Sequence, residues 1–333
     1  MLKNINSIFD CKSELDFLEL SIETFNFQYQ NNLVYKNWVD LLKVIPKHVI
    51  SLSDIPFLPI DFFRDQAVIS TPITEKTIKF TSSSTTSSFP SSHFVNDILL
   101  YEKSFLNAFE LFYGSVHNYC ILALLPNYLE RSGSSLVYMC KRLIEESDHP
   151  LSGFFLNDVD DLILKIKKLK TSNQKVLLIG VSYALMDLCD KELELNEQFI
   201  VMETGGMKGL RKEMLKLELH TYLKKGFKIN NIQSEYGMTE LLSQAYSLQN
   251  GLFQNPPWMK FLIREIDDPL MIRNDNKTGG INVIDLANQN SCSFIATKDL
   301  GRLVKNNNIE SLELMGRYDH SDTRGCNLMI DNF

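Results

Sequence analysis

The apolar run Lys175-Val176-Leu177-Leu178-Ile179-Gly180, with a helical stretch from Ser182 to Asp190 behind it, decides the fold class of this chain. The same unit returns directly afterwards, with a strand over Phe199 to Glu203 and a helix over Leu210 to Leu223. Short apolar runs that do not alternate with polar residues, and that are separated by helices, are typical of a parallel sheet covered on both faces. We therefore expect an α/β fold.

Strands and helices continue outward from this centre in both directions. Upstream, Tyr119 to Leu125 is predicted as a buried strand and Ser134 to Ser147 as the helix after it. The residues before Pro46 are predicted as helical, and Pro46 with the Pro56–Pro59 segment ends that layer. Beyond Asn255-Pro256-Pro257 the pattern changes to strands joined by turns. The strands predicted there are Lys260 to Glu265, Gly280 to Asp285, Ser293 to Thr297 and Ser311 to Met315.

These changes of pattern divide the chain into three parts. Residues 1–60 are predicted as an N-terminal helical segment, and residues 61–255 as an α/β core with mostly parallel sheets flanked by helices. Residues 256–333 are predicted as a smaller β-rich subdomain that ends in a cysteine-bearing segment.

Composition and charge exclude several classes of protein. The 333 residues carry 34 basic and 41 acidic side chains, and binding to nucleic acid needs clustered Lys and Arg, so we expect no nucleic-acid partner. No apolar run approaches the roughly 20 residues of a membrane helix, and the N-terminus lacks the apolar region of a signal peptide. The scattered cysteines indicate reduced thiols and a cytoplasmic protein. They are Cys11, Cys120, Cys140, Cys189, Cys292 and Cys326.

Several common catalytic motifs are absent from the sequence. There is no G-x-x-x-x-G-K-[ST], no G-x-G-x-x-G and no H-E-x-x-H, and no His and Cys pairs stand at zinc spacing. Zinc enzymes, P-loop kinases and ordinary dinucleotide oxidoreductases are therefore disfavoured.

One stretch of unusual composition runs from Thr81 to Ser88 and consists only of serine and threonine. It follows a short predicted strand around Ile78 and Phe80 and precedes Val95 to Phe112, which has apolar residues at helical spacing. Strand, hydroxyl-rich turn and helix is the layout of a loop that holds phosphate. A flexible linker is the alternative that the composition alone leaves open.

Two further segments leave strands and bring polar groups together. Glu203-Thr204-Gly205-Gly206 allows a ligand close to the backbone at a helix start, although a plain tight turn has the same composition. Ser234 to Glu240 combines an aromatic ring, a hydroxyl and two carboxylates, a set that could stack a base, touch a phosphate and hold Mg²⁺. A capped helix start, with Thr239 as the cap, is the alternative.

Two candidate nucleophiles stand out. Ser182 lies where a serine nucleophile elbow would sit, but Ala184 replaces the second glycine, and a helix N-cap is the preferred role of this serine. Cys326 lies beside Arg324 in a polar segment that contains glycine, and a neighbouring guanidinium favours the thiolate. Cys326 is therefore the cysteine predicted to react, with a small residue in a terminal turn as the alternative; the other cysteines are predicted as core residues.

Taken together, these segments resemble the adenylate-forming superfamily, and within it the acyl-protein synthetase family of the bacterial bioluminescence fatty-acid reductase complex. The resemblance runs from Ile55 to the C-terminus. The stretch Phe80 to Ser87 resembles the phosphate loop, and Tyr236 to Glu240 resembles the segment for adenine, α-phosphate and Mg²⁺. Thr297 to Gly301 resembles the motif whose aspartate binds the ribose hydroxyls, and Gly316 to Asp319 resembles the hinge segment.

The resemblance implies a site and its cofactors, ATP and Mg²⁺. It implies Cys326, Glu240 and Thr239 as catalytic residues, with Glu240 also as the metal ligand. The nucleotide-binding residues that it implies, together with the glycine turn, are Ser82, Ser83, Ser84, Thr85, Thr86, Gly205, Gly206, Tyr236, Gly237, Met238, Asp299 and Arg317.

The implied activity is that of an ATP-dependent acyl-protein synthetase. A carboxylic acid, expected to be a fatty acid, would become an acyl-adenylate, pass to Cys326 and then go to a partner protein such as a reductase or transferase. The family's usual C-terminal lid is expected to be absent, because the sequence stops at Phe333. Lys208, Arg211 and Lys298 are the candidate cations to replace the lid lysine.

The sequence departs from the family's pattern at two positions, and two other functions remain as alternatives. Ser84 and Ser87 stand where the family's phosphate loop has glycines, which restricts the backbone and adds side chains at the phosphate. One alternative is a truncated ligase that transfers the acyl group to CoA or to a carrier. The other is a degenerate nucleotide-binding scaffold without activity.

Overall fold

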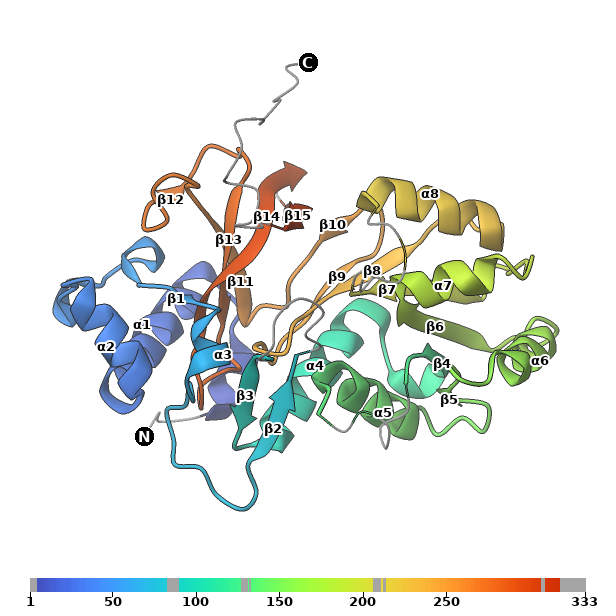
Figure 1. Ribbon diagram of the computed structural model, residues 1–333, viewed down its shortest axis with the longest axis horizontal. Helices are drawn as coiled ribbons and strands as arrows, with labels where there is room; N and C mark the ends of the chain where they lie inside the picture. Colours follow the sequence, from blue (N-terminus) through green and yellow to red (C-terminus); the bar gives the residue numbers. More distant parts are fainter. Residues whose placement is uncertain are drawn as a thin grey trace.

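A computed structural model describes residues 5–82, 90–126, 131, 133–205, 211, 214–306 and 309–317 of the chain. Within these residues the strands form a six-stranded sheet, a seven-stranded sheet and a two-stranded hairpin. Figure 1 shows the six-stranded sheet with its helices on the right and the seven-stranded sheet with the N-terminal helices on the left.

The six-stranded sheet contains the predicted parallel strands. Its order is β5-β4-β6-β7-β8-β9, and all neighbours pair in parallel except β8 and β9. Every residue of β4 is buried, which explains why its sequence is an unbroken apolar run. The strands are β4 (Tyr119–Leu124), β5 (Gly153–Phe154), β6 (Lys175–Val181), β7 (Phe199–Thr204), β8 (Gln233–Tyr236) and β9 (Ala245–Ser247).

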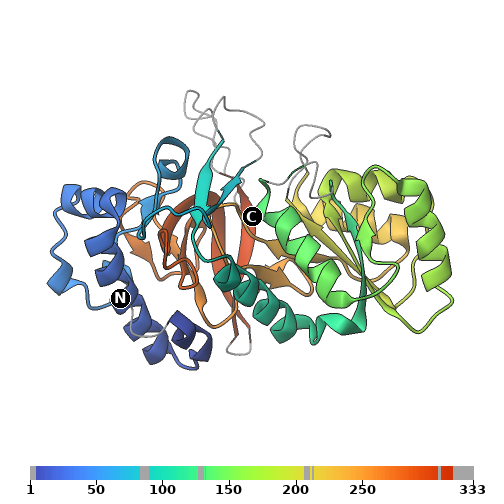
Figure 2. The same ribbon diagram turned by 90° about the horizontal axis from the view of Figure 1, so that it is seen from below.

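Helices cover both faces of this sheet. In Figure 1, α7 and α8 lie above the sheet and α4 and α5 below it, and Figure 2 shows α4 and α5 in front when the molecule is seen from below. Asp97, Ser134 and Asp158 cap α4, α5 and α6 by accepting backbone N–H groups of the first turn. The helices are α4 (Ile98–Tyr113), α5 (Ser135–Ser147), α6 (Val159–Leu169), α7 (Ser182–Cys189) and α8 (Lys216–Phe227).

The α/β fold class is confirmed, while the start of α8 was predicted too early. The helix begins at Lys216, because Leu215 has extended backbone angles and forms the N-cap; the predicted first residue, Leu210, lies outside the described residues. The Glu218 carboxylate accepts the backbone N–H of Leu215 at 3.2 Å and so satisfies one unpaired donor at this helix start.

The seven-stranded sheet forms the β-rich C-terminal region that the sequence predicts. Its strands pair antiparallel, except that β1 lies parallel to β14. The central strand β14 is longer than predicted, because it continues beyond Thr297 to pair with β15 as far as Asn306. The strands are β1 (Leu58–Pro59), β10 (Leu252–Phe253), β11 (Met259–Arg264), β12 (Ile272–Arg273), β13 (Gly279–Asp285), β14 (Phe294–Asn306) and β15 (Ile309–Arg317).

The N-terminal helices pack on this second sheet. Gln28 donates its side-chain N–H groups to the carbonyl oxygens of Asn288 and Gln289, both at 3.0 Å, and the Tyr35 ring stacks on Phe294. Gln28 and Tyr35 on the helices, and their contact residues on the sheet side, are all buried. The helical layer is therefore joined to the sheet by core contacts. The helices are η1 (Ile5–Asp10), α1 (Glu14–Asn31), α2 (Leu33–Leu41), η2 (Pro46–His48), η3 (Leu52–Asp54) and α3 (Phe62–Asp65), and η4 (Val116–Asn118) lies before β4.

The surroundings of the hydroxyl-rich stretch differ from the prediction. The stretch connects two antiparallel strands, β2 (Ile78–Thr81) and β3 (Ser92–Val95), in which Thr81 pairs with Ser92. The predicted helix begins only at Ile98, so a second strand, β3, stands between the hydroxyl-rich stretch and α4. Of β3, only Val95 was included in the predicted helical stretch, because this strand is short and α4 follows it closely.

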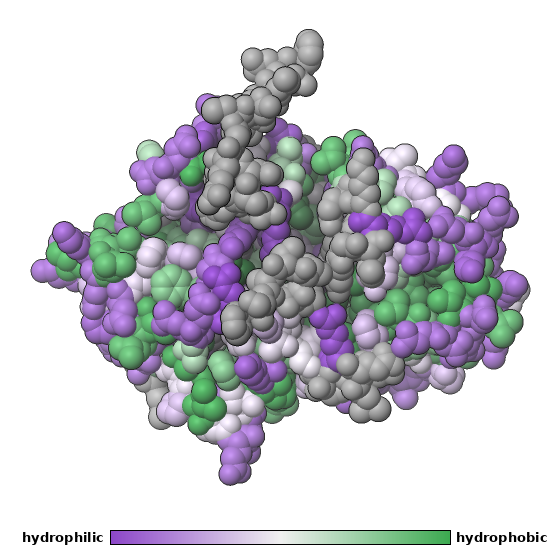
Figure 3. All heavy atoms as spheres, in the orientation of Figure 1, coloured by the Kyte–Doolittle hydropathy of each residue, from purple (hydrophilic) through white to green (hydrophobic). Residues whose placement is uncertain are grey.

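Over the described part of the chain, no helix is both long enough and apolar enough to cross a bilayer. On the face in Figure 3, apolar patches lie over the N-terminal helices and over the right half of the molecule, separated by hydrophilic side chains.

Candidate active site

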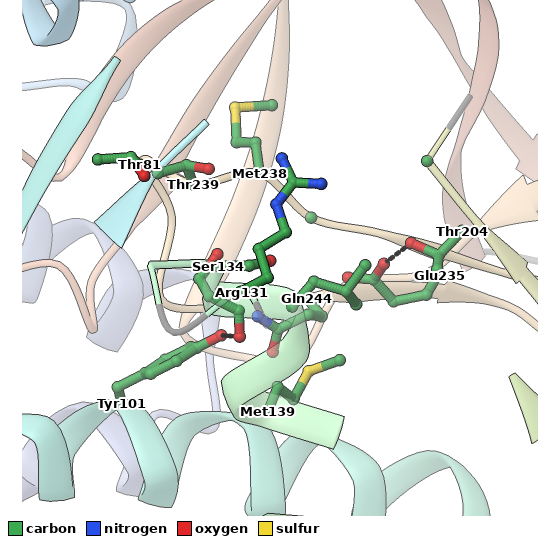
Figure 4. A pocket seen from close by; sticks show the side chains of 14 residues that line it. Thr81, Tyr101, Arg131, Ser134, Met139, Thr204, Glu235, Met238, Thr239 and Gln244 are labelled. Carbon is green, nitrogen blue, oxygen red and sulfur yellow. Dashed lines mark hydrogen bonds between the residues drawn. The ribbon is translucent and has the colours of Figure 1, made fainter. Parts of the chain in front are cut away.

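A cavity of about 170 Å³ lies where the parallel strands end. Thr204 closes β7, Glu235 lies in β8, and the N-terminus of α5 faces the same space through Ser134 and Ser135. In Figure 4, Thr81 and Thr239 lie at one end of the cavity and Tyr101 and Met139 at the other. Ligands of α/β proteins commonly bind at the carboxyl ends of parallel strands, so this cavity is the candidate site. The other lining residues are Arg131, Leu136, Gly205, Gly237, Met238 and Gln244.

The segment from Tyr236 to Glu240 is held from behind by two buried residues. The His93 ring lies with Nδ1 at 2.8 Å from the carbonyl oxygen of Thr239 and with Nε2 at 3.1 Å from the Asn288 side-chain oxygen. Asn288 donates its amide to the carbonyl oxygen of Glu240 at 2.7 Å. Burial lowers the pKa of His93 to about 4, although the contacts with Thr239 and Asn288 oppose this shift.

The continuation of this segment is anchored to the second sheet. The buried Asp285 carboxylate, at the end of β13, accepts the backbone N–H groups of Leu242 at 2.7 Å and Ser243 at 2.9 Å, together with the Ser243 hydroxyl. Burial raises the pKa of Asp285, and these hydrogen bonds oppose the shift. The segment that contains Leu242 and Ser243 connects strands of the six-stranded sheet, and through Asp285 it is also bonded to the seven-stranded sheet.

Three of the residues predicted to bind the nucleotide meet at the junction of the two sheets. The Tyr236 hydroxyl donates to Asp299 Oδ2 at 2.8 Å, and the Arg317 side chain lies 3.7 Å from the other oxygen of the same carboxylate. Burial raises the pKa of Asp299, while Arg317 and Tyr236 oppose that shift. Asp299 and Arg317 face each other in neighbouring strands, which places a carboxylate and a guanidinium beside the Tyr236 ring.

The predicted metal ligand, Glu240, is a buried carboxyl with 4% of its surface exposed. Burial raises its pKa, and its surroundings contain the Ser91 hydroxyl, Asp299 and the Arg317 guanidinium. Among the described residues, no group of three or more His, Cys, Asp or Glu side chains could hold a metal ion. A single carboxylate still fits Mg²⁺ that arrives with phosphate, since that ion commonly takes one or two protein carboxylates and keeps oxygen ligands from phosphate and water.

A second carboxyl, Glu235, lies in the wall of the cavity. Its carboxylate accepts the Thr204 hydroxyl, and burial together with the nearby Glu203 raises its pKa to about 7, although the Thr204 hydrogen bond opposes the shift. Gly237 lies directly against it: a methyl group on Gly237 would overlap Glu235 Oε1 and would stand 3.4 Å from Gln244 Cγ. The absence of a side chain at Gly237 therefore keeps this part of the wall open.

Ser182, the candidate hydrolase nucleophile, is buried in a polar network. Its hydroxyl lies 3.3 Å from Glu203 and 3.2 Å from the carbonyl oxygen of Gly205, and 1% of its surface is exposed. The prediction that Ser182 caps the helix is wrong, because Val181 is the N-cap and the Ser182 hydroxyl bonds to the neighbouring strand end instead. The geometry gives this serine a structural role.

Glu203 is the centre of that network. Lys216 Nζ lies 2.5 Å and His220 Nε2 3.3 Å from Glu203 Oε1, and the Ser234 hydroxyl donates to the same oxygen. Burial would raise the pKa of Glu203, but the Lys216 ammonium and the hydrogen bonds from His220, Lys216 and Ser234 outweigh it and hold the pKa at about 2. The charged network ties α7, β7, β8 and α8 together behind the cavity.

With this geometry defined, the comparison with protein families is decisive. The family model described as acyl-protein synthetase, LuxE, matches residues 9–333. The chain belongs to the LuxE acyl-protein synthetase family. It is therefore a ligase of the adenylate-forming kind. No curated protein matches this sequence.

Solved structures show the same fold at low sequence identity. A 2-hydroxyisobutyryl-CoA ligase in an open conformation, solved with 2-HIB-AMP and CoA, has a TM-score of 0.66 and 11% identity, over 91% of this chain and 74% of the ligase chain. ATP-bound MatB from Rhodopseudomonas palustris has a TM-score of 0.53 and 13% identity, over 72% of this chain and 47% of the MatB chain. Both similarities support the adenylate-forming fold of this LuxE-family chain.

Some of the predicted site residues lie outside the described residues of this LuxE-family protein. They are Ser83, Ser84, Thr85, Thr86, Gly206 and Cys326. Ser82 is described, and it ties β2 to the start of β3: its backbone N–H donates to the Ser91 carbonyl oxygen at 3.1 Å, and its hydroxyl accepts the Ser91 N–H at 2.9 Å. Gly205 lines the cavity with a φ of +66°, a backbone conformation that favours glycine.

Two of the three cations that could replace the lid lysine already form ion pairs with carboxylates. Arg211 pairs with Asp187 and Asp190, and Lys298 lies 2.6 Å from Asp61. Lys208 lies outside the described residues. Arg131, which no sequence pattern singled out, lines the cavity and adds a positive charge there.

Replacing Gly237 with alanine will impair the site without unfolding the protein. The new methyl group collides with Glu235 Oε1, and this carboxylate cannot swing away freely because Thr204 holds its other oxygen. Displacement of the site by about 1 Å typically lowers turnover by about 100-fold. We expect a loss of that order in acid-dependent pyrophosphate exchange.

The control for this substitution is Gly114→Ala, which adds a methyl group at a glycine with φ +79° and no neighbouring atom within 4 Å. That variant should lose stability through backbone strain alone and keep the parent exchange rate per folded molecule. Thermal unfolding measured on both variants separates the two effects. Equal exchange rates in Gly237→Ala and the parent would show that the wall need not be open at this point.

Proposed function

We propose that this protein activates a carboxylic acid with ATP and then carries the acyl group on its own cysteine. In the first step a carboxylate oxygen bonds to the α-phosphorus of ATP, the bond from that phosphorus to the bridging oxygen breaks, and pyrophosphate leaves. The product is an acyl-adenylate. The observation that carries the proposal is the convergence of Thr239, Tyr236 and Asp299 beside a cavity at the strand ends, in a chain of the LuxE family.

The residues of the proposed site have different tasks in this reaction. Thr81 and Thr239 offer hydroxyl groups at one end of the cavity, where hydrogen bonds to a charged phosphate are strongest. Tyr236 presents its ring to the adenine, while Asp299 accepts the ribose hydroxyls beside Arg317. Thr85 and Thr86, with Ser82 to Ser84, remain the predicted phosphate loop. Mg²⁺ held by Glu240 would neutralise phosphate charge when it is bound.

In the second step the Cys326 thiol loses its proton and attacks the acyl carbonyl carbon. The bond from that carbon to the adenylate oxygen breaks, AMP leaves, and an acyl thioester remains on the protein. We propose that a partner protein, such as a reductase or transferase, then takes the acyl group. The family resemblance implies a fatty acid as the substrate.

A cytoplasmic location is part of the same proposal. The described cysteines, Cys11, Cys120, Cys140, Cys189 and Cys292, are all free and buried. Reduced thiols of this kind fit a reducing compartment, in which a reactive cysteine would also stay available as an acyl carrier.

The test combines two measurements on the full chain with a panel of carboxylic acids. Exchange of labelled pyrophosphate into ATP should depend on both the acid and Mg²⁺, and intact mass should rise by the mass of the acyl group. Exchange without a mass increase, followed by product formation once CoA or a carrier is added, would support the truncated-ligase alternative. Neither exchange nor adduct with any acid would support the inactive scaffold, and hydrolysis of esters without ATP would support a hydrolase.

A further inference from the structure

The wall of the cavity carries one cation, Arg131, among the residues that the structure describes there. Its side chain forms no hydrogen bond and no ion pair with any described residue. Arg131 is only partly exposed, so its guanidinium has lost part of its hydration without gaining a carboxylate partner. A cation in this condition beside a ligand cavity indicates an anionic group on the ligand.

The other cations near this cavity already have carboxylate partners. Lys216 Nζ lies 2.5 Å from the Glu203 carboxylate, and the Arg317 guanidinium lies 3.7 Å from Asp299. The carboxyl groups of the site also oppose the entry of a phosphate chain, because like charges repel. Arg131 is therefore the cation of the described wall that is available to offset this repulsion.

The backbone next to Arg131 is joined to the start of the hydroxyl-rich stretch. The backbone N–H of Thr81 donates to the Gly133 carbonyl oxygen at 2.7 Å. The two residues are also in close contact, since a methyl group on Gly133 would stand 2.9 Å from the Thr81 hydroxyl oxygen. Thr81 is the first residue of that stretch and one of the proposed phosphate contacts. Arg131 is thus held beside the proposed phosphate end of the cavity.

The direction of the side chain agrees with this position. In Figure 4, Arg131 extends away from Tyr101 and toward the side of the cavity on which Met238 and Thr239 lie. Thr239 belongs to the segment that resembles the one for the α-phosphate, whereas Arg131 is joined to the stretch that resembles the phosphate loop. This order of contacts favours the β- and γ-phosphate groups as the partner of the guanidinium.

Resting on the proposed function, we propose that Arg131 is a catalytic residue that donates to the β- and γ-phosphate groups of ATP and holds them as pyrophosphate leaves. When the bond from the α-phosphorus to the bridging oxygen breaks, its electron pair stays on that oxygen and adds to the negative charge of pyrophosphate. The planar guanidinium can donate two parallel N–H bonds to phosphate oxygens. A donor already fixed where this charge develops lowers the barrier.

The first measurement is the affinity of the full chain for ATP and for AMP, each with Mg²⁺ and without acid, by titration calorimetry. AMP lacks the two phosphate groups that Arg131 is proposed to hold. Arg131→Gln should therefore weaken ATP binding by about 10- to 100-fold, the value of a hydrogen bond to a charged group, and leave AMP binding unchanged. Arg131→Lys keeps the charge but loses the planar fork, so its effect on ATP binding should be intermediate.

The second measurement is acid-dependent exchange of pyrophosphate into ATP. Arg131→Gln should lower its kcat by about 100- to 1,000-fold, as the loss of one donor at a developing charge does, while the KM for the acid stays near the parent value. The matched control is Arg302→Gln, the same change at an arginine of β14 that pairs with Glu313 and does not line the cavity. It should leave both measurements unchanged. Thermal unfolding of each variant checks the fold.

Three results would overturn the proposal. Unchanged ATP affinity in Arg131→Gln would show that the guanidinium does not contact the phosphate chain. Equal loss of ATP and AMP affinity would exclude a role specific to the β- and γ-phosphate groups. A raised KM for the acid at unchanged ATP affinity would assign Arg131 to the substrate carboxylate. A parent protein that neither binds ATP nor exchanges pyrophosphate with any acid would contradict the proposed function instead, so the two failures are distinguishable.

Discussion

Cys326→Ser is expected to form no acyl thioester while it still exchanges pyrophosphate into ATP at nearly the parent rate. A serine hydroxyl is a weak nucleophile near pH 7 without an adjacent base, whereas a thiol is partly ionised and intrinsically more nucleophilic. Adenylation precedes the attack by the thiol, so its rate should not depend on this side chain. With labelled acid and ATP, the parent should reach about one hydroxylamine-sensitive acyl group per chain, and the variant should have none.

The described cysteines cannot replace Cys326 in this reaction. All of them are buried, and burial raises the pKa of each thiol, to about 11 for Cys120 and to about 12 for Cys189 and Cys292. A thiol with such a pKa is almost fully protonated near pH 7 and is inaccessible to an adenylate. Persistent labelling of Cys326→Ser would therefore contradict the acyl-enzyme and point to a nucleophile of another kind.

Cys11→Ser is the matched control, because Cys11 lies near the other end of the sequence from Cys326 and its thiol donates a hydrogen bond to the nearby Ser13 carbonyl oxygen. This variant should be labelled to the same extent as the parent. Loss of label in both variants would indicate damage to the fold and not the loss of a nucleophile. Circular dichroism and thermal unfolding of each variant complete the comparison.

The sequence predicted the central strands β4, β6 and β7 of the parallel sheet well, because each is a short apolar run whose residues are almost all buried. Tyr119 to Leu125 and Phe199 to Glu203 differ from β4 and β7 by a single residue at one end. The pairing of β2 with β3 was missed, although a strand around Ile78 and Phe80 was predicted. The four residues of β3 lie just before α4 and leave too little alternation to be recognised as a strand.

From the sequence alone, candidate site residues could be named only where they belong to short recognisable segments. Tyr236 to Glu240, Asp299 and Arg317 form recognisable segments, and the structure brings Tyr236, Asp299 and Arg317 together. His93 and Asn288, which hold the first of these segments in place, are 146 residues from Thr239 and 48 residues from Glu240 in the sequence. A buried hydrogen bond over such a separation leaves no local pattern in the sequence.

Asp299→Ala should raise the KM for ATP by about 100-fold, because two ribose hydroxyls would each lose a hydrogen bond to a charged acceptor, at about 1.5 kcal/mol or more for each bond. The geometry sets the carboxylate up for this role: Tyr236 fixes one oxygen and Arg317 balances the charge from the other side. Asp299→Asn keeps one acceptor oxygen and should have an intermediate effect. The KM for the acid should change little, since this carboxylate does not line the cavity.

Two controls separate ribose binding from support of the Tyr236 ring. Tyr236→Phe removes the hydroxyl that donates to Asp299 and keeps the ring, so we expect about a 10-fold change at most, the value of one ordinary hydrogen bond. Asp275→Ala removes a carboxylate that pairs with Arg273 at the surface of the same sheet, and it should leave the KM for ATP unchanged. If Tyr236→Phe raised that KM as much as Asp299→Ala, the carboxylate would act by positioning the ring, and direct binding of the ribose by Asp299 would be wrong.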